Sequence, residues 1–450
     1  MRAPSFITAF ALVSAVFLTA GAGAAPADPV GGTVSADPVG GTATAVSVGG
    51  NALRQAQDLA SLVGAAEPGG VVRLPEGTYA GGVTIDKPLT LIGEAGAVID
   101  GGGAGHVLTL AAPDITVKGL TVRNSGDSLN EEHSGIFVTE AADRALVEGN
   151  RLEHNLIGVY LKGPDDAVVK GNHIAGRTDL RVNERGNSIH LWNTPGSRIV
   201  GNTITGGRDG IFTTTSKDNV FAGNTMDGVR FAVHYMYTNR SILRGNVSRN
   251  NDAGYVIMFS HHLTVEDNLS RGDRDHGLLF NYANSSTMRG NAVVDGGEKC
   301  VFIYNANKNE FRGNRFEGCG IGIHFTAGSE RNTIVRNAFI NNESQVKYVG
   351  TTHLEWAEDG VGNYWSDNAA FDLNADGIAD RPYRPNGLVD QIVWRAPKAK
   401  LLLTSPAVQI VRWAQSAFPA ILPGGVVDPY PLMQPPAEAA APQMAEVPEQ

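Results

Sequence analysis

Short runs of alternating apolar and polar residues recur through the middle of the chain, as in SILRGNVS (241–248) and NEFRGNRF (309–316). Each run contains an asparagine, usually preceded by glycine, and successive asparagines lie 22, 30, 22, 22, 22, 23, 23 and 23 residues apart. They are Asn150, Asn172, Asn202, Asn224, Asn246, Asn268, Asn291, Asn314 and Asn337. A fixed period near 22 with strand-type alternation and no helical pattern predicts a solenoid of stacked strands.

The pattern favours an all-β fold, a right-handed parallel β-helix in which each coil supplies three short strands. Gly-Asn is expected to form a turn between two of these strands. Because asparagine tolerates the left-handed backbone conformation and stacked amides can hydrogen-bond between coils, we interpret the asparagines as structural. Leu53–Val63 is amphipathic at helical spacing and predicts a helix that caps the N-terminal end of the β-helix.

The period also aligns the strand that follows each Asn turn. Two rows are mostly aliphatic or aromatic and are expected to face inward: Ile136, Val159, Ile189, Ile211, Val233, Tyr255, Leu278, Val301 and Ile323, and, two residues on, Val138, Leu161, Leu191, Thr213, Tyr235, Ile257, Phe280, Ile303 and Phe325. The row between them is expected to face outward: Phe137, Tyr160, His190, Phe212, His234, Val256, Leu279, Phe302 and His324. One outer face is therefore unusually apolar, which is typical of an interaction surface.

The segment FAVHYMYTNRS (231–241) places His234 and Met236 on this outer face, and the period places Met258 on the next coil beside Met236. Histidine and methionine together suit a soft or borderline ion, above all copper. His190, His261 and His262 complete the candidate copper ligands. The alternative is a docking face that uses methionine as adaptable contact surface and includes Trp192 and Phe212. An insertion, GRTDLRVNERGN (176–187), is expected to loop out beside His190 and Trp192.

Composition predicts the character of both ends of the chain. Arg2, an apolar core and a small-residue cleavage site in 1–25 predict a secretory signal peptide, hence an exported protein. We expect a flexible linker at 26–50, the β-helix at 51–348, a C-terminal extension at 349–433 and a disordered tail at 434–450. The net charge of −10 argues against a nucleic-acid partner. Cys300 and Cys319 stand about three positions out of register, so two buried free thiols are expected.

Two acidic segments carry residues suited to chemistry. DRDHG (273–277), with Arg208, Arg230 and Arg274 near the same edge, could serve a polysaccharide epimerase or lyase, or be solvated turn residues. DLNADGIAD (372–380) has the spacing of a calcium loop, with oxygens from Asp372, Asn374, Asp376, the Ile378 carbonyl and Asp380. Its twelfth position is Tyr383, which excludes a full EF-hand, and the alternative is an Asx-rich turn.

The C-terminal third is similar to the end of NosD proteins. The matching pieces are GNYWSD (362–367), the acidic loop 372–380, RPYRPN (381–386) and GGVVDPYPLM (424–433). With the coils and FAVHYMYTNRS, the resemblance covers about 53–433. It implies a non-enzymatic periplasmic protein that works with an ABC permease and ATPase and a copper-chaperone lipoprotein. The implied task is the supply of copper to the copper–sulfur centre of nitrous oxide reductase. No copper-ligand motif of the family transfers onto this sequence.

A last apolar segment, SPAVQIVRWAQSAFP (405–419), predicts a short helix capped by Ser405. At about thirteen residues it is too short to span a bilayer. It either packs on the last coil as a cap or docks into the permease. The resemblance favours docking, through Val411, Trp413 and Phe418.

Overall fold

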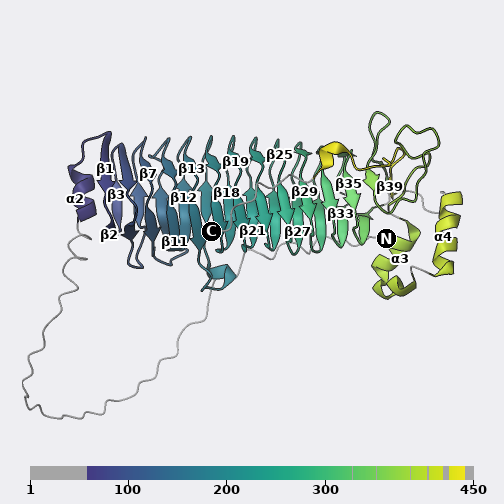
Figure 1. Cartoon of the computed structure of the whole chain (residues 1–450), viewed down its shortest axis with the longest axis horizontal. Coiled ribbons are helices and arrows are strands. Elements are labelled where there is room, and N and C mark those ends of the chain that lie inside the picture. Colours follow the sequence, from purple (N-terminus) through teal and green to yellow (C-terminus); the bar gives the residue numbers. More distant parts are fainter. Residues whose placement is uncertain are drawn as a thin grey trace, which may run out of the picture. The chain divides into compact units, whose positions relative to one another are not determined.

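The computed structural model describes residues 58–440, except 327, 351, 386, 403–404 and 419–424. The predicted signal peptide and linker, and the first residues of the predicted cap helix, lie outside the described residues. The described chain forms three long parallel sheets, and each strand pairs with the strand three places further along the chain (Figure 1). This is the parallel β-helix that the period predicts.

Sheet 1 contains 12 strands: β1 (Gly70–Leu74), β4 (Leu89–Gly93), β7 (Thr116–Lys118), β10 (Leu146–Glu148), β13 (Val168–Lys170), β16 (Arg198–Val200), β19 (Val220–Ala222), β22 (Ile242–Arg244), β25 (Thr264–Glu266), β28 (Thr287–Arg289), β31 (Glu310–Arg312) and β34 (Thr333–Val335). Sheet 2 contains 13 strands: β2 (Gly77–Ala80), β5 (Ala97–Asp100), β8 (Thr121–Arg123), β11 (Arg151–Asn155), β14 (His173–Gly176), β17 (Thr203–Thr205), β20 (Thr225–Asp227), β23 (Val247–Arg249), β26 (Leu269–Arg271), β29 (Ala292–Val294), β32 (Arg315–Glu317), β35 (Ala338–Ile340) and β38 (Tyr364–Trp365).

Sheet 3 contains 12 longer strands and carries the candidate site: β3 (Val83–Ile85), β6 (Leu108–Leu110), β9 (Ser134–Val138), β12 (Ile157–Lys162), β15 (Ile189–Trp192), β18 (Asp209–Thr214), β21 (Phe231–Met236), β24 (Ala253–Met258), β27 (His276–Asn281), β30 (Lys299–Tyr304), β33 (Ile321–Thr326) and β36 (Ser344–Val349). The 176–187 insertion, with the short helix η1 (Val182–Glu184), precedes β15 at the corner between sheets 2 and 3.

The asparagines form a ladder between sheets 1 and 2. The backbone N–H of Asn224 donates to Oδ1 of Asn246 at 3.0 Å, and this bond repeats from Asn150 to Asn337. Asn363 of GNYWSD is the last rung. The left-handed conformation belongs to the preceding residue and not to asparagine, as with Gly245 at φ 60°. The expected left-handed backbone of asparagine was therefore wrong, whereas the expected amide hydrogen bonds between coils are confirmed.

The predicted inward rows are confirmed. Val233 and Tyr235 of β21 are fully buried, and the register pairs Val233 with Tyr255 and Tyr235 with Ile257. The outward row is not fully exposed either, because Tyr160, His234 and Val256 are buried and its other members are half-buried. Its side chains cover one another from coil to coil, so that Tyr160 and Val256 are almost inaccessible. This face is a second packed layer rather than a fully exposed stripe.

Both ends of the β-helix are covered. Helix α2 (Asp58–Ala65) buries Leu59 and Val63 in the core, which agrees with the predicted N-terminal cap. At the other end, Trp356 and Trp365 join the core, and Trp365 stacks on Phe339 at 4.4 Å. Buried Asp428 accepts hydrogen bonds from the Trp365 indole and the Asn363 backbone, both at 2.7 Å. The GNYWSD and GGVVDPYPLM motifs are thus partners within the C-terminal cap.

Cys300 and Cys319 form a disulfide, so the expectation of free thiols was wrong. Their Cα atoms lie 5.6 Å apart. Cys300 is in β30, whereas Cys319 lies at the corner between β32 and β33 of the next coil. The chain changes direction at this corner, so a sequence separation of 19 residues brings the side chains together where a strand pair needs 22.

The C-terminal extension contains α3 (Leu388–Arg395), η2 (Pro397–Leu402), α4 (Pro406–Ala417) and η4 (Ala437–Ala439), and β37 (His353–Glu355) pairs with β39 (Gly425–Val427). The tail expected to be disordered from 434 is ordered in its described part, up to 440. Ala439 is buried against Ala338 and Ile340 of β35. Small alanine side chains fit this shallow surface, which composition alone did not predict. Residues 441–450 lie outside the described part.

Candidate metal-binding face

Strands β18, β21 and β24 bring the central copper candidates onto the outer face of sheet 3. Met236 and Met258 are direct register partners on adjacent strands, with both side chains half-buried. Adjacent parallel strands are about 4.8 Å apart, so two thioethers stand within reach of one ion. His234 lies two residues before Met236 and shares its face. The structure therefore places His234, Met236 and Met258 on one outer face, with the His234 ring in contact with Phe212 and Phe231.

A buried carboxylate orients His234. The imidazole Nδ1 lies 3.1 Å from Oδ2 of Asp209, and the two oxygens of Asp209 also accept two hydrogen bonds from Arg230 at 2.7 Å. Burial acts to raise the pKa of Asp209, but the bonds from His234 and Arg230 and the charge of Arg230 outweigh it and lower the pKa. Asp209 is therefore ionised at neutral pH and selects the tautomer with hydrogen on Nδ1.

The other ring nitrogen of His234 has no partner. The side chain is only about a tenth exposed, and the buried Nε2 makes no hydrogen bond. A histidine that binds a metal commonly donates its second ring N–H to a carboxylate, which fixes the ring and raises ligand basicity. The Asp209–His234 pair has this arrangement, and Nε2 is left without a hydrogen-bond partner. Sequence analysis missed Asp209, which stands 25 residues before His234.

His190 takes no part in this group. It stacks between Tyr160 at 4.4 Å and Phe212 at 4.9 Å, and Phe212 separates it from His234 by a second ring contact of 4.9 Å. Burial lowers the pKa of His190 to about 4, so its ring is neutral at neutral pH. Two strand spacings, about 9–10 Å, are too long for His190 and His234 to bind one ion. His190 is a member of a ring stack.

His261 and His262 lie at the corner after β24. Nδ1 of His261 is 3.4 Å from Nδ2 of Asn284, and His262 is exposed with φ 58°. They adjoin the methionine pair along the chain but do not complete a ligand set by themselves. Among the described residues, no three His, Cys, Asp or Glu side chains converge into a metal-binding group.

The candidate docking residues of this face differ in exposure. Trp192 is 43% exposed at the end of β15, whereas Phe212 is half-buried in the ring stack. Beyond the methionines, Tyr237, Phe259 and Tyr282 form a second stack with ring separations of 5.1 and 5.3 Å. Their spacing of 22 and 23 residues was the available signal for this stack. The methionine pair is therefore flanked by aromatic surface.

Helix α4 exposes the residues expected to meet a partner. Trp413 is 66% exposed and Phe418 62%, and Ile410 adds a third exposed apolar side chain, while Val411 is partly buried. The side chain of Gln415 accepts a hydrogen bond from the Leu388 backbone and ties α4 to α3. Trp356, Trp365 and Asp428 supply the C-terminal cap instead. Across the described residues, no helix has both the length and the apolar character of a membrane span.

The acidic side chains of loop 372–380 accept hydrogen bonds from the backbone of the same loop. Asp372 accepts from the backbone of Gly377 at 2.8 Å, Asp376 accepts from Ile378 at 2.8 Å, and Asp380 accepts from Leu373 at 2.7 Å. Asn374 donates its side-chain amide to Asp376 at 2.9 Å. The structure thus accounts for these side chains without calcium, and the calcium site stays a prediction.

The residues considered for sugar chemistry do not converge. Asp273 lies inside the β-helix, where burial raises its pKa, and it accepts hydrogen bonds from Ser248 at 2.6 Å and Ser270 at 2.5 Å. Arg274 lies outside and is paired with Asp252 and Asp275 at 3.0 and 2.9 Å. A carboxylate enclosed in the core cannot act as a base on a bound polysaccharide.

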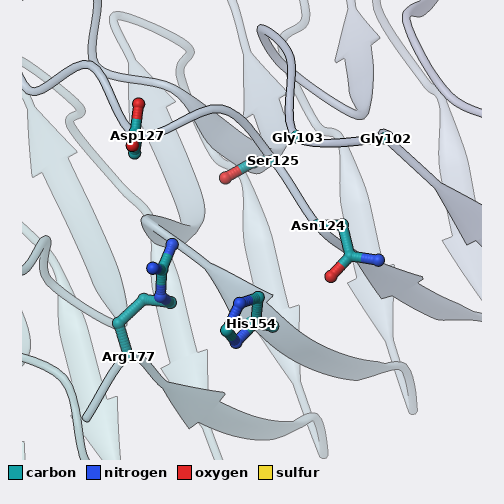
Figure 2. Close-up of a pocket in the computed structure, with 7 residues that line it drawn as sticks. All are labelled: Gly102, Gly103, Asn124, Ser125, Asp127, His154 and Arg177. Carbon is teal, nitrogen blue, oxygen red and sulfur yellow. The ribbon is translucent and has the colours of Figure 1, made fainter. Parts of the chain in front are cut away.

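A shallow pocket at the corner between sheets 2 and 3 was not predicted. Its lining, drawn in Figure 2, is Gly102, Gly103, Asn124, Ser125, Asp127, His154 and Arg177. Figure 2 shows the Arg177 guanidinium on the side of Asp127, with His154 beside it. Arg177 is already held by two hydrogen bonds from its guanidinium to Asp179, at 2.7 and 2.6 Å. Its charge is therefore satisfied within the protein.

Known proteins resemble this chain in sequence. A family model described as "Periplasmic copper-binding protein (NosD)" matches residues 170–370. A "Probable ABC transporter binding protein NosD" of Stutzerimonas stutzeri is 43% identical over 380 residues, which cover 81% of this chain and 87% of that protein. A protein of the same description from Pseudomonas aeruginosa is 42% identical over 404 residues, covering 87% and 94%.

Solved β-helical structures are more distant. Alginate lyase AlyF-OU02 matches with a TM-score of 0.47 at 15% identity, covering 69% of this chain and 89% of the lyase. The A-module of the Azotobacter vinelandii mannuronan C-5 epimerase AlgE6 has a TM-score of 0.45 at 13% identity, with coverage of 66% and 91%. At these values nothing follows about activity. The sequence relatives decide the family: this chain belongs to the NosD family, whose model describes periplasmic copper-binding proteins.

Proposed function

We propose that this protein receives Cu(I) on the outer face of sheet 3 and hands it on for the copper–sulfur centre of nitrous oxide reductase. Its partners in this proposal are a copper-chaperone lipoprotein, which delivers the ion, and an ABC permease and ATPase. The observation that carries the proposal is the His234 imidazole, which Asp209 orients with Nε2 unpaired, beside the Met236–Met258 register pair. The family description and the relatives' names support the copper and transporter parts of it.

The chemistry of the proposed ligand atoms suits copper transfer rather than copper storage. Thioether sulfur and imidazole nitrogen select Cu(I) over the hard cations of the periplasm. The methionine side chains are half-buried and flexible, so they can exchange partners when a donor protein docks. The aromatic surface around them supplies apolar contact for such a partner. A site of one histidine and two methionines at the surface binds reversibly, as a handover requires.

An anaerobic Cu(I) competition titration of the mature protein tests the proposal. We expect His234→Ala/Met236→Ala/Met258→Ala to weaken Cu(I) binding or uptake from the chaperone by at least about tenfold, or about 1.4 kcal/mol. The matched control is His173→Ala, an exposed histidine of β14 on sheet 2, which should bind copper like the parent. An unchanged Cu(I) affinity in the triple variant would indicate that this face is a docking surface and not a copper site. Turnover of a uronate polymer by the purified protein would favour an epimerase or lyase instead.

We further propose that α4 holds the protein against the permease. Helix α4 and its C-cap residue expose the large apolar side chains Ile410, Trp413 and Phe418, and an exposed apolar surface of this kind is typical of a protein–protein contact. The variant Ile410→Ser/Trp413→Ser should keep the melting temperature of the parent but lose co-purification with the permease. Co-purification at the parent's level would place the contact elsewhere.

A further inference from the structure

Arg208 carries a charge that the protein does not neutralise. It lies at the corner immediately before β18, is half-buried, and its buried Nε makes no hydrogen bond. Burial lowers the pKa of Arg208, the neighbouring charge of Arg230 lowers it further, and Asp209 only partly opposes both. A half-buried guanidinium without an ion-pair partner is unfavourable, because burial removes hydrating water and the protein provides no hydrogen-bond acceptor for Nε in its place.

The neighbouring side chains are committed elsewhere. Asp209, the carboxylate beside Arg208, is saturated by two bonds from Arg230 and one from His234. Arg230 also lies over the ring of Phe231 at 4.3 Å. A third guanidinium, that of Arg185 in the insertion, donates to the carbonyls of Leu180 and Thr178 at 2.7 and 2.9 Å. Its Nη1 is 3.5 Å from the carbonyl oxygen of Gly207.

The following coils do not share this excess of positive charge. The corner position held by Arg208 and Arg230 is taken there by Asp252, Asp275 and Glu298. At this corner the cations of those coils have carboxylate partners: Arg274 pairs with Asp252 and Asp275, and Lys299 pairs with Glu298. Among the described residues of this corner, a guanidinium with an unpaired Nε therefore lies beside the Asp209–His234 pair.

We propose that Arg208 is the anchor of a binding site for a small oxyanion, next to the histidine of the methionine face. The ligand class is a carboxylate or a tetrahedral oxyanion of sulfate size, because two of its oxygens can meet the planar fork of a guanidinium. Arg230 and Arg185 supply further positive potential but keep their own partners. The inference does not depend on the proposed copper function, since it rests on the charge balance of this corner.

Thermal unfolding of the mature protein tests this site with two probes, sodium sulfate and sodium acetate, each exchanged for chloride at constant ionic strength. The test variant is Arg208→Met, and the control is Arg198→Met, an exposed arginine of β16 with the same charge change. The control is needed because sulfate raises the melting temperature of most proteins without binding a site. We expect at least one anion to stabilise the parent and the control more than Arg208→Met, with an affinity at least about tenfold weaker in that variant.

The anion-free baseline separates ligand binding from a structural role. If Arg208 serves the ligand, Arg208→Met should melt in chloride at the temperature of the parent or higher, since a half-buried charge without an ion-pair partner has been removed. Equal anion responses in the parent and in Arg208→Met would overturn the inference. A variant that melts lower in chloride and keeps the anion response would likewise show that Arg208 is structural. A response to only one of the two probes would identify the ligand as planar or tetrahedral.

Discussion

Asn246 provides the sharpest test of how the β-helix is held together. Its side-chain oxygen accepts bonds from the backbone and side-chain nitrogens of Asn224, at 3.0 and 2.9 Å. Its side-chain nitrogen donates to the carbonyl of Phe221 and to Oδ1 of Asn268, both at 2.9 Å, and to the Arg244 carbonyl at 3.1 Å. Asn246→Ala removes five hydrogen bonds at a fully buried position.

The expected loss of stability follows from the buried polar groups that Asn246→Ala leaves without a hydrogen-bond partner. A typical hydrogen bond contributes about 0.5–1.5 kcal/mol net, and a buried group left without a partner costs about 1–3 kcal/mol. With some relaxation of the two neighbouring rungs, we expect Asn246→Ala to lower the free energy of unfolding by about 3–5 kcal/mol. The loss should appear as a lower midpoint in urea unfolding followed by circular dichroism.

The control is Asn183→Ala in the exposed insertion helix η1, which should change stability by less than about 0.5 kcal/mol. Equal midpoints for the two variants would refute the ladder as a source of stability. A loss below about 1 kcal/mol for Asn246→Ala would show that water or a backbone shift replaces the missing amide.

The remaining predictions concern the register, the disulfide and the C-terminal cap. Ile257→Ala, at a fully buried position, should destabilise the protein by about 2–5 kcal/mol, whereas Met258→Ser on the outer face should cost about 1 kcal/mol or less; similar urea midpoints would contradict the register. Reducing the Cys300–Cys319 disulfide, or changing both cysteines to serine, should lower the free energy of unfolding by about 3 kcal/mol for a loop of this size. Unchanged thermal stability after reduction would show that the disulfide does not stabilise the fold. Burial raises the pKa of Asp428 to about 6, although hydrogen bonds from Asn363, Trp365 and Tyr430 act to lower it. The folded state therefore takes up a proton as the pH falls from 7.5 towards 5, whereas the unfolded state does not, and the folded state gains stability. Calorimetry should show this rise in melting temperature in the parent but not in Asp428→Asn, and a parallel rise in both would assign it to other groups.

The sequence predicted those parts of the fold that repeat with the coil. Residues 22 or 23 apart stack on the same face, so the inward rows and the Met236–Met258 pair followed from counting. The contacts that were missed join positions that are not register partners. Asp209 and His234 lie on adjacent strands of sheet 3, but they are 25 residues apart and Asp209 is the register partner of Phe231. Cys300 and Cys319 are 19 residues apart and meet at a corner. A period identifies register partners and not side chains that reach another position of the next coil.

The candidate site was likewise predicted only in those features that follow from alternation and period. His234, Met236 and Met258 were found because alternation and period place them on one face, whereas His190 was included although a complete coil separates it from His234. The burial of the outward row was not predicted, since it arises from rings that stack on one another rather than on the sheet. The asymmetry of His234, with one nitrogen held and the other unpaired, required coordinates.

X-ray absorption at the copper K-edge, on the mature protein loaded anaerobically with one equivalent of Cu(I), tests the central claim most directly. The account predicts a mixed shell, with nitrogen near 2.0 Å from His234 and sulfur near 2.3 Å from the two methionines, by analogy with first-row metal distances of about these values. Met236→Leu/Met258→Leu, which keeps the volume and removes the sulfur, should lose the sulfur scattering. A parent spectrum with nitrogen and oxygen neighbours alone, or a sulfur shell that persists in the double variant, would contradict the assignment.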